Sequence, residues 1–599
     1  MAFKTKRSVS AIIDETGDQD SERPDYSNML AVLEAKGTSD KQLEAYAQLI
    51  EYSRNIYPHQ HNRRFVWGLT VCGSSMRICI LQNDALIASS PIDMKSADGR
   101  LKFVKWCVNA SLCDEDQLGY DPTVFFNDAK NRWEIKVFDD NNDNDNRDNG
   151  NGNRSDDYAD IHSFKTYQIL TCMRVAERVF GRHTRCFRCR EITDSDNDDD
   201  NNNNANSDKD VLTKKWGKFT LEELCETGNI LVKDAWAHAE RDAVGDSSRD
   251  EITLMREIND ALGDISELAD KFPAILAAGI VRQSGSDGQM HLDTVDNILA
   301  LVKDSLPRDQ VHQRVHKRIA MTPIGKNLRE VKCVDELIIA AADAMEVHTA
   351  ISKKCRILHR DISSNNILIR QSLDTGRVHG ILIDFDCALR IDHNSDKDRP
   401  RRPDMTGTRP YMSIGNLSKS SVERTVLDDW ESIIYVLCWL GTFGVNYDDE
   451  HLHNNEDIDE NRPKIYNWNT GTSASIADDK RTDMHSQAIF RSRIVNRFIK
   501  KSEYIYLKRL VVALREKLID NPNVSGLGRG SLNMIDDNDD IFEPVAVVEE
   551  DYWDSKCSKD ERDPFVRRSI CADLIADDLL KVMIQARKEA ISRLYEYDK

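Results

Sequence analysis

The sequence lacks an apolar run long enough to cross a membrane. Its longest apolar run, Ile433–Val445, has 13 residues, whereas a helix needs roughly 20 to span the hydrocarbon core of a bilayer. The first residues, M-A-F-K-T-K-R-S, contain no hydrophobic stretch of the kind found in secretory signals. We therefore expect no membrane partner and an intracellular chain, in the cytoplasm or the nucleus.

The chain also has few basic residues relative to acidic ones and few closely spaced cysteines, and each shortage makes one class of function less expected. The chain has 82 lysines and arginines against 103 aspartates and glutamates, a formal net charge of −21. This charge repels nucleic-acid phosphates at long range, so we expect no nucleic-acid partner. The 14 cysteines are scattered and offer one close pair, Cys186 and Cys189, which favours reduced thiols over a disulfide framework or a structural zinc site.

Two segments are unusually rich in aspartate and asparagine. These residues make up 14 of the 19 positions in Asp139–Asp157 and 10 of the 11 in Asp194–Asn204. Such polar, like-charged tracts cannot bury a core, so we expect disordered insertions. A calcium loop is the alternative, but the spacing lacks the glycine and the terminal glutamate of an EF-hand.

The patterns of the remaining sequence predict an α+β chain of several domains. At about 150 residues per domain, 599 residues correspond to roughly four units. The expected segments are an N-terminal tail with a helix at Ser39–Ile56 (1–58), a β-rich module with strands at Phe65–Cys72, Met76–Leu81 and Ala85–Met94 (59–138), a disordered linker (139–163), a mixed region with a disordered insert at about 194–210 (164–324), a mostly helical region (325–520), and an extension ending in the helix Ile570–Tyr595 (521–599).

One stretch carries the pattern of a chemical site. It begins at Ile357 with I-L-H-R-D-I-S-S-N-N-I-L-I and continues after a D-T-G turn with V-H-G-I-L-I-D-F-D-C-A-L. Two apolar strands joined by a hairpin would bring Asp361, Asn366 and Asp384 to one end. A carboxylate that orients a hydroxyl beside two oxygen ligands for Mg²⁺ is what phosphoryl transfer requires.

These residues resemble the catalytic core of protein kinases. The pattern H-R-D-x-x-x-x-N starts at His359, and D-F-D stands where most protein kinases have D-F-G. The variants H-R-D-I-S and I-D-F-D, with G-T-R-P-Y-M-S at Gly407 and D-D-W-E-S-I-I-Y-V-L at Asp428, resemble the fungal-type protein kinase family. Further motifs, R-F-V-W-G-L-T, L-G-Y-D-P-T and I-L-V-K-D-A-W, extend the resemblance over about residues 60–500.

The resemblance implies a protein-kinase-like two-lobe fold, with a β-rich small lobe at 164–324 and a helical large lobe at 325–520. A family-specific β-rich module would precede the small lobe, and the acidic insertions would interrupt the chain. It also implies that Asp361 is the catalytic base and that Asn366 and Asp384 are the magnesium ligands. Lys233 would hold the α- and β-phosphates of ATP and pair with Glu251, with Glu257 as the rival partner. Lys233 could instead be an ordinary lysine at a strand end.

Other site residues follow from the same resemblance. His359 and Arg360 belong to the catalytic loop, where Arg360 would bind a phosphorylated residue of the following segment. Thr408 would contact the catalytic aspartate. Gly181 is the single glycine of a reduced phosphate-covering turn, or of a plain strand turn, in which Arg182 or His183 would contact phosphate.

Three positions depart from the usual kinase pattern. Ser363, a predicted cofactor-binding residue, stands where serine/threonine kinases carry a lysine that neutralises the γ-phosphate. Ser413-Ile414-Gly415 replaces A-P-E, whose glutamate anchors the substrate lobe. Asp386 replaces the glycine of the magnesium loop. These departures bear on which class of substrate the site accepts and on the rate of phosphoryl transfer, more than on whether ATP binds.

The sequence thus predicts an ATP- and Mg²⁺-dependent kinase that phosphorylates serine or threonine hydroxyls of a protein substrate. A small-molecule kinase on the same fold would need the same aspartates and asparagine, but the G-T-R-P-Y segment is typical of peptide docking. A pseudokinase that binds partners without transfer is the second alternative, and the retained catalytic groups count against it.

Overall fold

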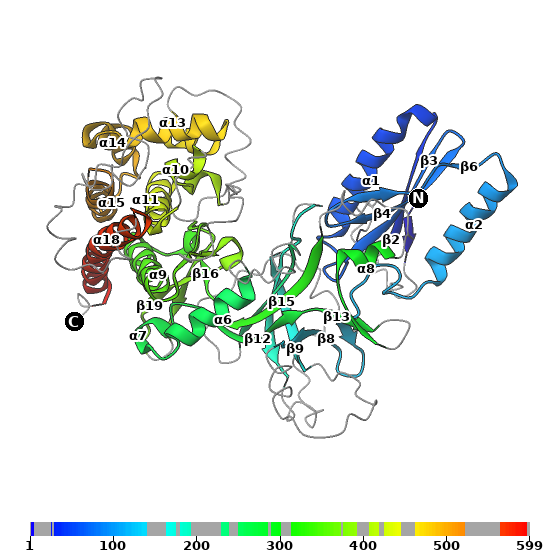
Figure 1. The fold of residues 1–599 in the computed structure, drawn as a ribbon, viewed down its shortest axis with the longest axis horizontal. Coiled ribbons are helices and arrows are strands. Elements are labelled where there is room, and N and C mark those ends of the chain that lie inside the picture. Colours follow the sequence, from blue (N-terminus) through cyan, green and yellow to red (C-terminus); the bar gives the residue numbers. More distant parts are fainter. Residues whose placement is uncertain are drawn as a thin grey trace, which may run out of the picture. The chain divides into compact units, whose positions relative to one another are not determined.

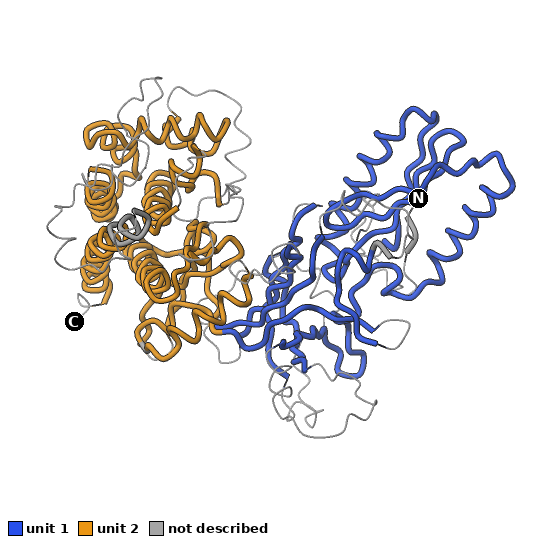
Figure 2. The backbone as a smooth tube through the Cα atoms, viewed as in Figure 1, with its two compact units in different colours: residues 1–219, 227–244, 275–322 blue, residues 220–226, 245–274, 323–599 orange. Residues whose placement is uncertain are grey.

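The protein is described by a computed structural model of residues 1–599, which covers residues 2–4, 26, 29–140, 163–174, 180–192, 229–238, 250–284, 289–300, 313–372, 375–391, 407–418, 424–444, 462–520 and 564–595. The chain divides into two compact units (Figure 2). Unit 1 comprises residues 1–219, 227–244 and 275–322. Unit 2 comprises residues 220–226, 245–274 and 323–599.

Unit 1 begins with a six-stranded sheet and two helices (Figure 1). The strand order is β1-β2-β3-β4-β5, with β6 also paired to β4, and β2 and β3 run parallel. Parallel neighbours need a crossover connection, which α1 supplies. The elements are β1 (Ala2–Lys4), β2 (Met29–Lys36), η2 (Ser39–Lys41), α1 (Gln42–Ile56), β3 (Phe65–Cys72), β4 (Ser75–Gln82), β5 (Leu86–Ala88), β6 (Ile92–Asp93) and α2 (Ala97–Leu112).

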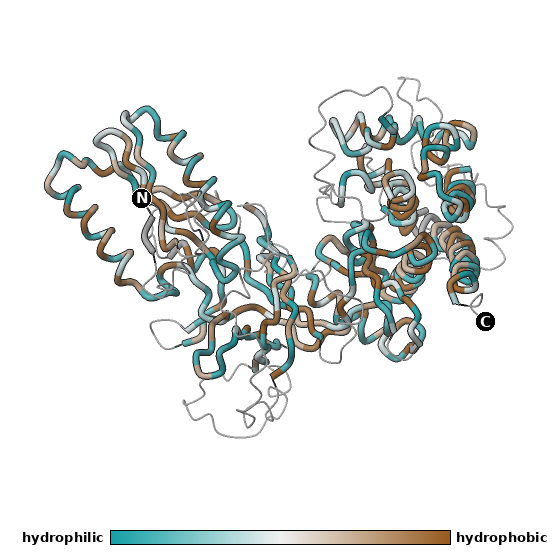
Figure 3. The backbone as a smooth tube through the Cα atoms, turned by 180° about the vertical axis from the view of Figure 1, so that it is seen from behind, coloured by the Kyte–Doolittle hydropathy of each residue, from teal (hydrophilic) through white to brown (hydrophobic). Residues whose placement is uncertain are grey.

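The two helices cover opposite faces of this sheet. Leu49 and Ile56 of α1 pack with Val66 of β3, whereas Trp106 of α2 packs with Leu69 of the same strand. Residues 66 and 69 lie on opposite faces because successive side chains of a strand alternate. Along both helices the colour in Figure 3 changes between hydrophilic and hydrophobic, as expected of helices that place one face on a sheet.

The rest of unit 1 is built on a seven-stranded sheet in the order β12-β15-β11-β10-β9-β8-β7. Its core contains Ile135, Tyr167, Phe187 and Val232, all buried. The elements are β7 (Val124–Asn127), β8 (Arg132–Phe138), β9 (Phe164–Arg174), β10 (Arg185–Glu191), β11 (Ile230–His238), β12 (Ala274–Ile280), β13 (Arg282–Ser284), β14 (Met290–Leu292), α8 (Val295–Ala300) and β15 (Arg314–Thr322).

Unit 2 is mostly helical around α9 and α11, whose buried faces are apolar along most of their length. A three-stranded sheet, β16-β18-β19, packs against α9. The elements are α6 (Glu251–Leu262), α7 (Ser266–Ala269), β16 (Lys326–Asn327), η7 (Leu328–Glu330), α9 (Val334–Cys355), β17 (Ile357–Leu358), β18 (Ile367–Gln371), β19 (Val378–Leu382), η8 (Phe385–Cys387), β20 (Leu389–Arg390), η10 (Arg409–Tyr411), α10 (Ile414–Leu417), α11 (Val426–Phe443), η11 (Lys464–Asn469), α13 (Ser473–Met484), α14 (Gln487–Arg493), η12 (Val495–Arg497), α15 (Tyr504–Leu518) and α18 (Pro564–Tyr595).

The α+β class is confirmed, and so are the helices expected at 39–56 and 570–595, the latter starting earlier, at Pro564. The expected strand Ala85–Met94 is wrong in one respect: it forms two short strands, β5 and β6, separated by a segment that contains Pro91, whose ring nitrogen cannot donate to a ladder. Within the described ranges, no helix is both long and apolar enough to cross a membrane.

The two acidic tracts fall almost entirely outside the described residues. Of the first, Asp139 and Asp140 are described, and Asp140 is bound: its carboxylate accepts from the Ile280 N–H at 3.0 Å and from Arg282 Nη1 at 2.8 Å. β8 and β9, which lie before and after this tract, pair with each other. The last strands of the segment 59–138 and those after residue 163 therefore share one sheet.

A row of buried charges crosses three strands of the second sheet. The register places Asp234 of β11 opposite Arg185 of β10 and Arg318 of β15. Asp234 accepts from Arg318 Nε at 2.7 Å and from Arg185 Nη1 at 3.4 Å. All three side chains are buried. Because an unpaired buried charge is strongly destabilising, each of these charges depends on the others.

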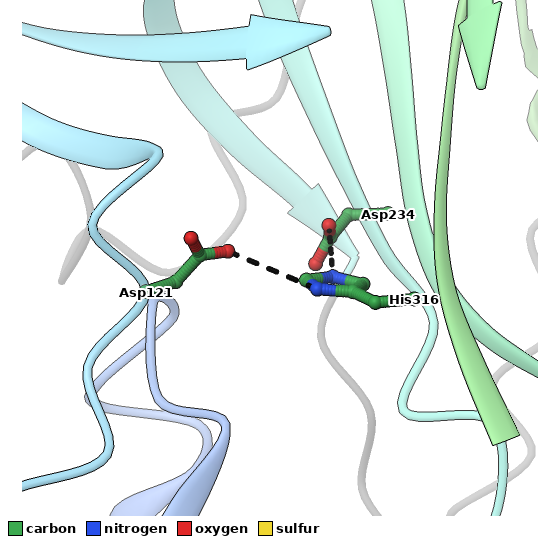
Figure 4. Close-up of side chains that lie close together, drawn as sticks. All are labelled: Asp121, Asp234 and His316. Atoms are coloured by element: carbon green, nitrogen blue, oxygen red, sulfur yellow. Dashed lines mark hydrogen bonds and ion pairs between the residues drawn. The ribbon is translucent and has the colours of Figure 1, made fainter. Parts of the chain in front are cut away.

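His316 lies at the centre of this network, between two carboxylates. Its Nε2 is 2.7 Å from Asp234 Oδ1 (Figure 4), and its Nδ1 is 2.8 Å from Asp293 Oδ2. The imidazole also stacks on the ring of Trp236, with centroids 4.6 Å apart. Burial disfavours the imidazolium, but the two carboxylates outweigh this cost and raise the pKa of His316 to about 9.

The same network joins the N-terminal part of unit 1 to the second sheet. Arg64, which precedes β3, donates to Asp293 Oδ1 at 3.1 Å, and Arg318 forms an ion pair with Asp121. Burial opposes the ionisation of Asp121, yet the positive charges of Arg318 and His316 hold its pKa below the usual value. Three carboxylates, three guanidiniums and one imidazolium thus hold the two sheets together.

We expect alkaline pH to weaken unit 1 through His316. Its pKa is raised in the folded chain, so its stabilisation is fully present below pH 6.5 and is lost as the pH rises towards 9. At roughly 1.4 kcal/mol per pH unit, the loss amounts to about 3 kcal/mol. Denaturant unfolding followed by tryptophan fluorescence at pH 6.5 and 9 measures it.

The matched variants are His316→Gln and, as control, His59→Gln, which changes an exposed histidine. The control should keep the wild-type loss of stability between the two pH values, whereas His316→Gln should be less stable at pH 6.5 and nearly independent of pH. An unchanged pH slope in His316→Gln would contradict the assignment.

Candidate active site

Asp429 of α11 fixes the start of the loop that joins β17 to β18. The backbone N–H groups of His359 and Arg360 donate to its two carboxylate oxygens, each at 3.0 Å. His348 of α9 adds a third contact, with Nε2 2.8 Å from Oδ2. Burial opposes the ionisation of Asp429, but these hydrogen bonds and the nearby histidines lower its pKa. The loop is thereby tied to α9 and α11.

Asp361 is held on both of its carboxylate oxygens. Thr408 donates to Oδ1 through its backbone N–H and its hydroxyl, each at 2.8 Å, and Asn366 Nδ2 lies 3.2 Å from Oδ2. Burial, and next the negative charge of Asp384, raise the pKa of Asp361 to about 6 against these hydrogen bonds. The group is ionised at neutral pH, with a pKa suited to a general base.

The hairpin predicted from the sequence is present and brings Asp361, Asn366 and Asp384 together. β18 and β19 pair from Ile367 opposite Leu382 to Gln371 opposite Val378. The three residues lie at the open end of this hairpin, where the Ile383 N–H donates to the Asn366 carbonyl at 2.9 Å. Because Asn366 Nδ2 is engaged by Asp361, its side-chain oxygen is the atom that remains for a cation.

Asp384 lies in a group of three carboxylates. One oxygen each of Glu251, Asp384 and Asp386 lie within 4.8 Å of one another. Asp384 adopts a φ of 68°, in the left-handed region, directly before Phe385, whose ring packs on His359 with centroids 4.8 Å apart. Clustered carboxylate oxygens beside an asparagine suit a hard divalent cation such as Mg²⁺.

The structure separates the two glutamates considered as partners of Lys233. Glu251 is the one that lies beside Asp384 and Asp386, whereas Glu257 forms an ion pair with Arg390 of β20. Ser363 is buried, and within the described residues no group hydrogen-bonds its hydroxyl. It therefore supplies neither a charge nor an exposed donor at the position where the kinase pattern has a lysine.

The remaining predicted site residues belong to unit 1. Lys233 lies on β11, opposite Cys186 and Ile319, and is 6% exposed. Gly181 has a φ of 130°, a conformation that glycine adopts without strain, and the Arg182 carbonyl accepts from the Trp236 N–H at 2.8 Å. His183 is buried against the ring of Tyr57, so it offers little surface to a phosphate.

The segment that replaces A-P-E is anchored by two residues that the sequence analysis did not identify. Lys480 of α13 donates to the Met412 carbonyl at 2.6 Å, and Glu431 of α11 accepts from the Ile414 N–H at 2.8 Å. Both are buried, and burial lowers the pKa of Lys480 despite the charge of Glu431. Glu431 lies in the D-D-W-E-S motif directly before the apolar run of α11, and this position was the available signal. The polar sequence around Lys480 gave none.

A second group with metal-ligand spacing is excluded by its partners. Asp121, Asp234 and His316 offer one ligand atom each within 4.8 Å. Arg318, however, already pairs with both carboxylates, and His316 carries a proton on each nitrogen when it bonds Asp234 and Asp293. A cation would have to displace this buried guanidinium, so the group serves the fold.

Comparison with known proteins identifies one family. A sequence model of the family described as fungal protein kinase matches residues 9–441. Among the curated proteins, none matches the chain. The match includes the H-R-D-I-S and D-F-D motifs and Asp429, and it ends within α11.

We expect Asp429→Asn to destabilise unit 2 by about 3 kcal/mol, because an amide places a donor opposite two backbone N–H groups and His348 in a buried site. Denaturant unfolding followed by circular dichroism measures the change. Asp478→Asn, at an exposed position of α13, is the matched control and should change stability by less than about 0.5 kcal/mol. Equal effects of the two substitutions would contradict the role of Asp429.

Proposed function

Because the chain belongs to the fungal protein kinase family, we propose that it transfers the γ-phosphate of Mg-ATP to serine or threonine hydroxyls of protein substrates. The observation that carries this proposal is the convergence of Asp361, Asn366 and Asp384 at one end of the β18–β19 hairpin. Phosphoryl transfer depends mainly on positioning and on charge neutralisation, and these three side chains supply both functions.

Asp361 is the proposed base. Thr408 and Asn366 hold its carboxylate in one orientation, and with a pKa of about 6 it is ionised at neutral pH and able to accept the proton of a substrate hydroxyl. Asp384 and Asn366 are the proposed ligands of Mg²⁺, which when bound neutralises charge on the phosphates. Lys233 is the proposed phosphate-binding lysine.

A protein substrate is favoured over a small molecule by the segment after Gly407. It is fixed at one end by the contact of Thr408 with Asp361 and at the other by Lys480 and Glu431. An anchored segment next to the base is a surface on which a peptide can be aligned. The buried hydroxyl of Ser363 leaves one cation fewer at the γ-phosphate, which favours slow transfer and keeps the pseudokinase as the alternative.

Asp384→Asn is expected to abolish most of the stabilisation by Mg-ATP, because the side chain proposed to bind Mg²⁺ loses its full negative charge. Wild-type protein at an Mg-ATP concentration of 100 times Kd should gain about 2.7 kcal/mol. Thermal unfolding with ATP and Mg²⁺, and with ATP and a chelator, measures the difference. Asp260→Asn, an exposed change on α6, should behave as wild type; a full Mg-ATP shift in Asp384→Asn would refute the metal assignment.

Asp361→Asn is expected to leave Mg-ATP binding nearly intact while lowering transfer by about 10² or more, the scale for loss of a positioned general base. The assay uses Mg²⁺ and γ-labelled ATP with mass spectrometry of the products. Ser363→Ala, which removes a buried hydroxyl with no hydrogen-bond partner among the described residues, is the matched control and should cost little.

The pH profile tests the same assignment. Wild-type transfer should decline as the pH falls through about 6, because Asp361 becomes protonated, and bound Mg²⁺ should move this decline lower by offsetting the charge of Asp384. Undiminished transfer in Asp361→Asn would point to another mechanism. Clear Mg-ATP binding without transfer by the wild type would establish the pseudokinase alternative.

A further inference from the structure

The strand that leads to Asp384 forms the edge of its sheet. β19 pairs with β18 on one side, in the order β16-β18-β19. Alternate residues of an antiparallel strand direct their N–H groups to opposite edges. The N–H groups of Val378, Gly380 and Leu382 therefore face away from β18, towards the rest of unit 2.

Each of these three N–H groups has an acceptor outside the sheet. The acceptors come from α18, from α9 and from the segment after α7: Tyr595 Oη for Val378 at 3.1 Å, Asp343 Oδ2 for Gly380 at 3.0 Å and the Lys271 carbonyl for Leu382 at 3.1 Å. The outer edge of β19 is thus hydrogen-bonded as regularly as a strand in the middle of a sheet.

Two of these three contacts depend on α18. Tyr595 makes the first one directly. Arg587, two turns earlier on the same helix, donates to Asp343 Oδ1 at 2.5 Å and to Glu346 Oε2 at 2.6 Å. Asp343 is buried, so the guanidinium neutralises the carboxylate whose other oxygen holds the Gly380 N–H. Lys271 Nζ completes the group, 3.1 Å from Asp343 Oδ1.

β19 and α9 pack so closely that no side chain fits between them at Gly380. A Cβ at Gly380 would lie 2.0 Å from the Ala340 carbonyl oxygen, so the strand and the helix touch through their backbones. A shift of β19 along its axis is therefore transmitted to the residues that follow it. Ile383 is the next residue, and its carbonyl accepts from His359 Nε2 at 3.0 Å; Asp384 comes directly after it.

We propose that Arg587 and Tyr595 are positioning residues for the magnesium loop. Helix α18 holds the outer edge of β19 and through this strand determines the position of Asp384. On the other side, His359 of the catalytic loop holds the carbonyl of Ile383, the residue before Asp384. The family match ends at residue 441, so α18 lies beyond the residues that it covers. The inference rests on the proposed role of Asp384 as a Mg²⁺ ligand.

The test is the Mg²⁺ dependence of ATP binding by the full chain, read as the Mg²⁺ concentration that gives half of the ATP-induced thermal shift. Tyr595→Phe removes the hydroxyl and keeps the ring, and Arg587→Met removes the charge and keeps the length. Each should raise this midpoint about tenfold, the scale for groups that support metal ligands. Excess Mg²⁺ should restore the shift, and Arg587→Lys should recover part of the affinity.

Arg593→Met is the matched control on the same helix. Arg593 pairs with Asp335 of α9 and packs over the ring of Tyr506 of α15, 3.7 Å from its centroid, and so differs from Arg587 and Tyr595, whose partners belong to β19 or hold it. Its loss should lower the melting temperature but leave the Mg²⁺ midpoint within about twofold of wild type. Unchanged midpoints in both Tyr595→Phe and Arg587→Met would overturn the inference, as would an equal rise in Arg593→Met.

A separate transfer assay distinguishes this inference from the proposed function. If the wild type binds Mg-ATP but transfers nothing, the proposed function fails, and the shifted midpoints still support the positioning role. If the wild type shows no Mg²⁺-dependent ATP binding, both fail. Tyr595→Phe changes a single atom near the end of a helix, so it is expected to fold and keeps the test decisive.

Discussion

The buried carboxylate of Asp429 is the constraint on which the candidate site depends. By accepting the N–H groups of His359 and Arg360, it replaces the strand partners that an irregular loop lacks, so these two N–H groups are not left unsatisfied. Asp361 then needs only its contacts with Thr408 and Asn366 to be oriented. A group remote from the reacting atoms thus determines where the base stands.

In unit 1, too, buried charged side chains fix the position of a backbone segment, here with more charges involved. Asp234 immediately follows Lys233, and since successive side chains of a strand point to opposite faces, the lysine and the charge network lie on opposite sides of β11. The row formed by Arg185, Asp234 and Arg318 fixes β11 on the face opposite to Lys233. Because removing one partner of a buried ion pair is strongly destabilising, a change of register that separated these charges would be costly.

The sequence was sufficient for the parts of the molecule in which structure and chemistry are local. Two apolar runs on either side of a turn predicted the β18–β19 hairpin, and the motif spacing placed Asp361, Asn366 and Asp384 at one end of it. Two other anchors could not be predicted, because they join distant segments: Asp234 meets His316 from 82 residues away, and Lys480 meets the backbone of Met412 from 68. No local periodicity records such pairs, and Asp234, His316 and Lys480 each look like an ordinary polar residue.

The hydrogen bond between Val378 and Tyr595 spans 217 residues, and this separation has a consequence for biosynthesis. At about 5–20 residues per second, a ribosome needs roughly 10 to 40 s to make the intervening chain. During that interval the outer edge of β19 has no partner from α18. An open strand edge is a template for wrong pairing, so the nascent chain passes through a period in which this edge is open to such pairing, and slower elongation would lengthen that period.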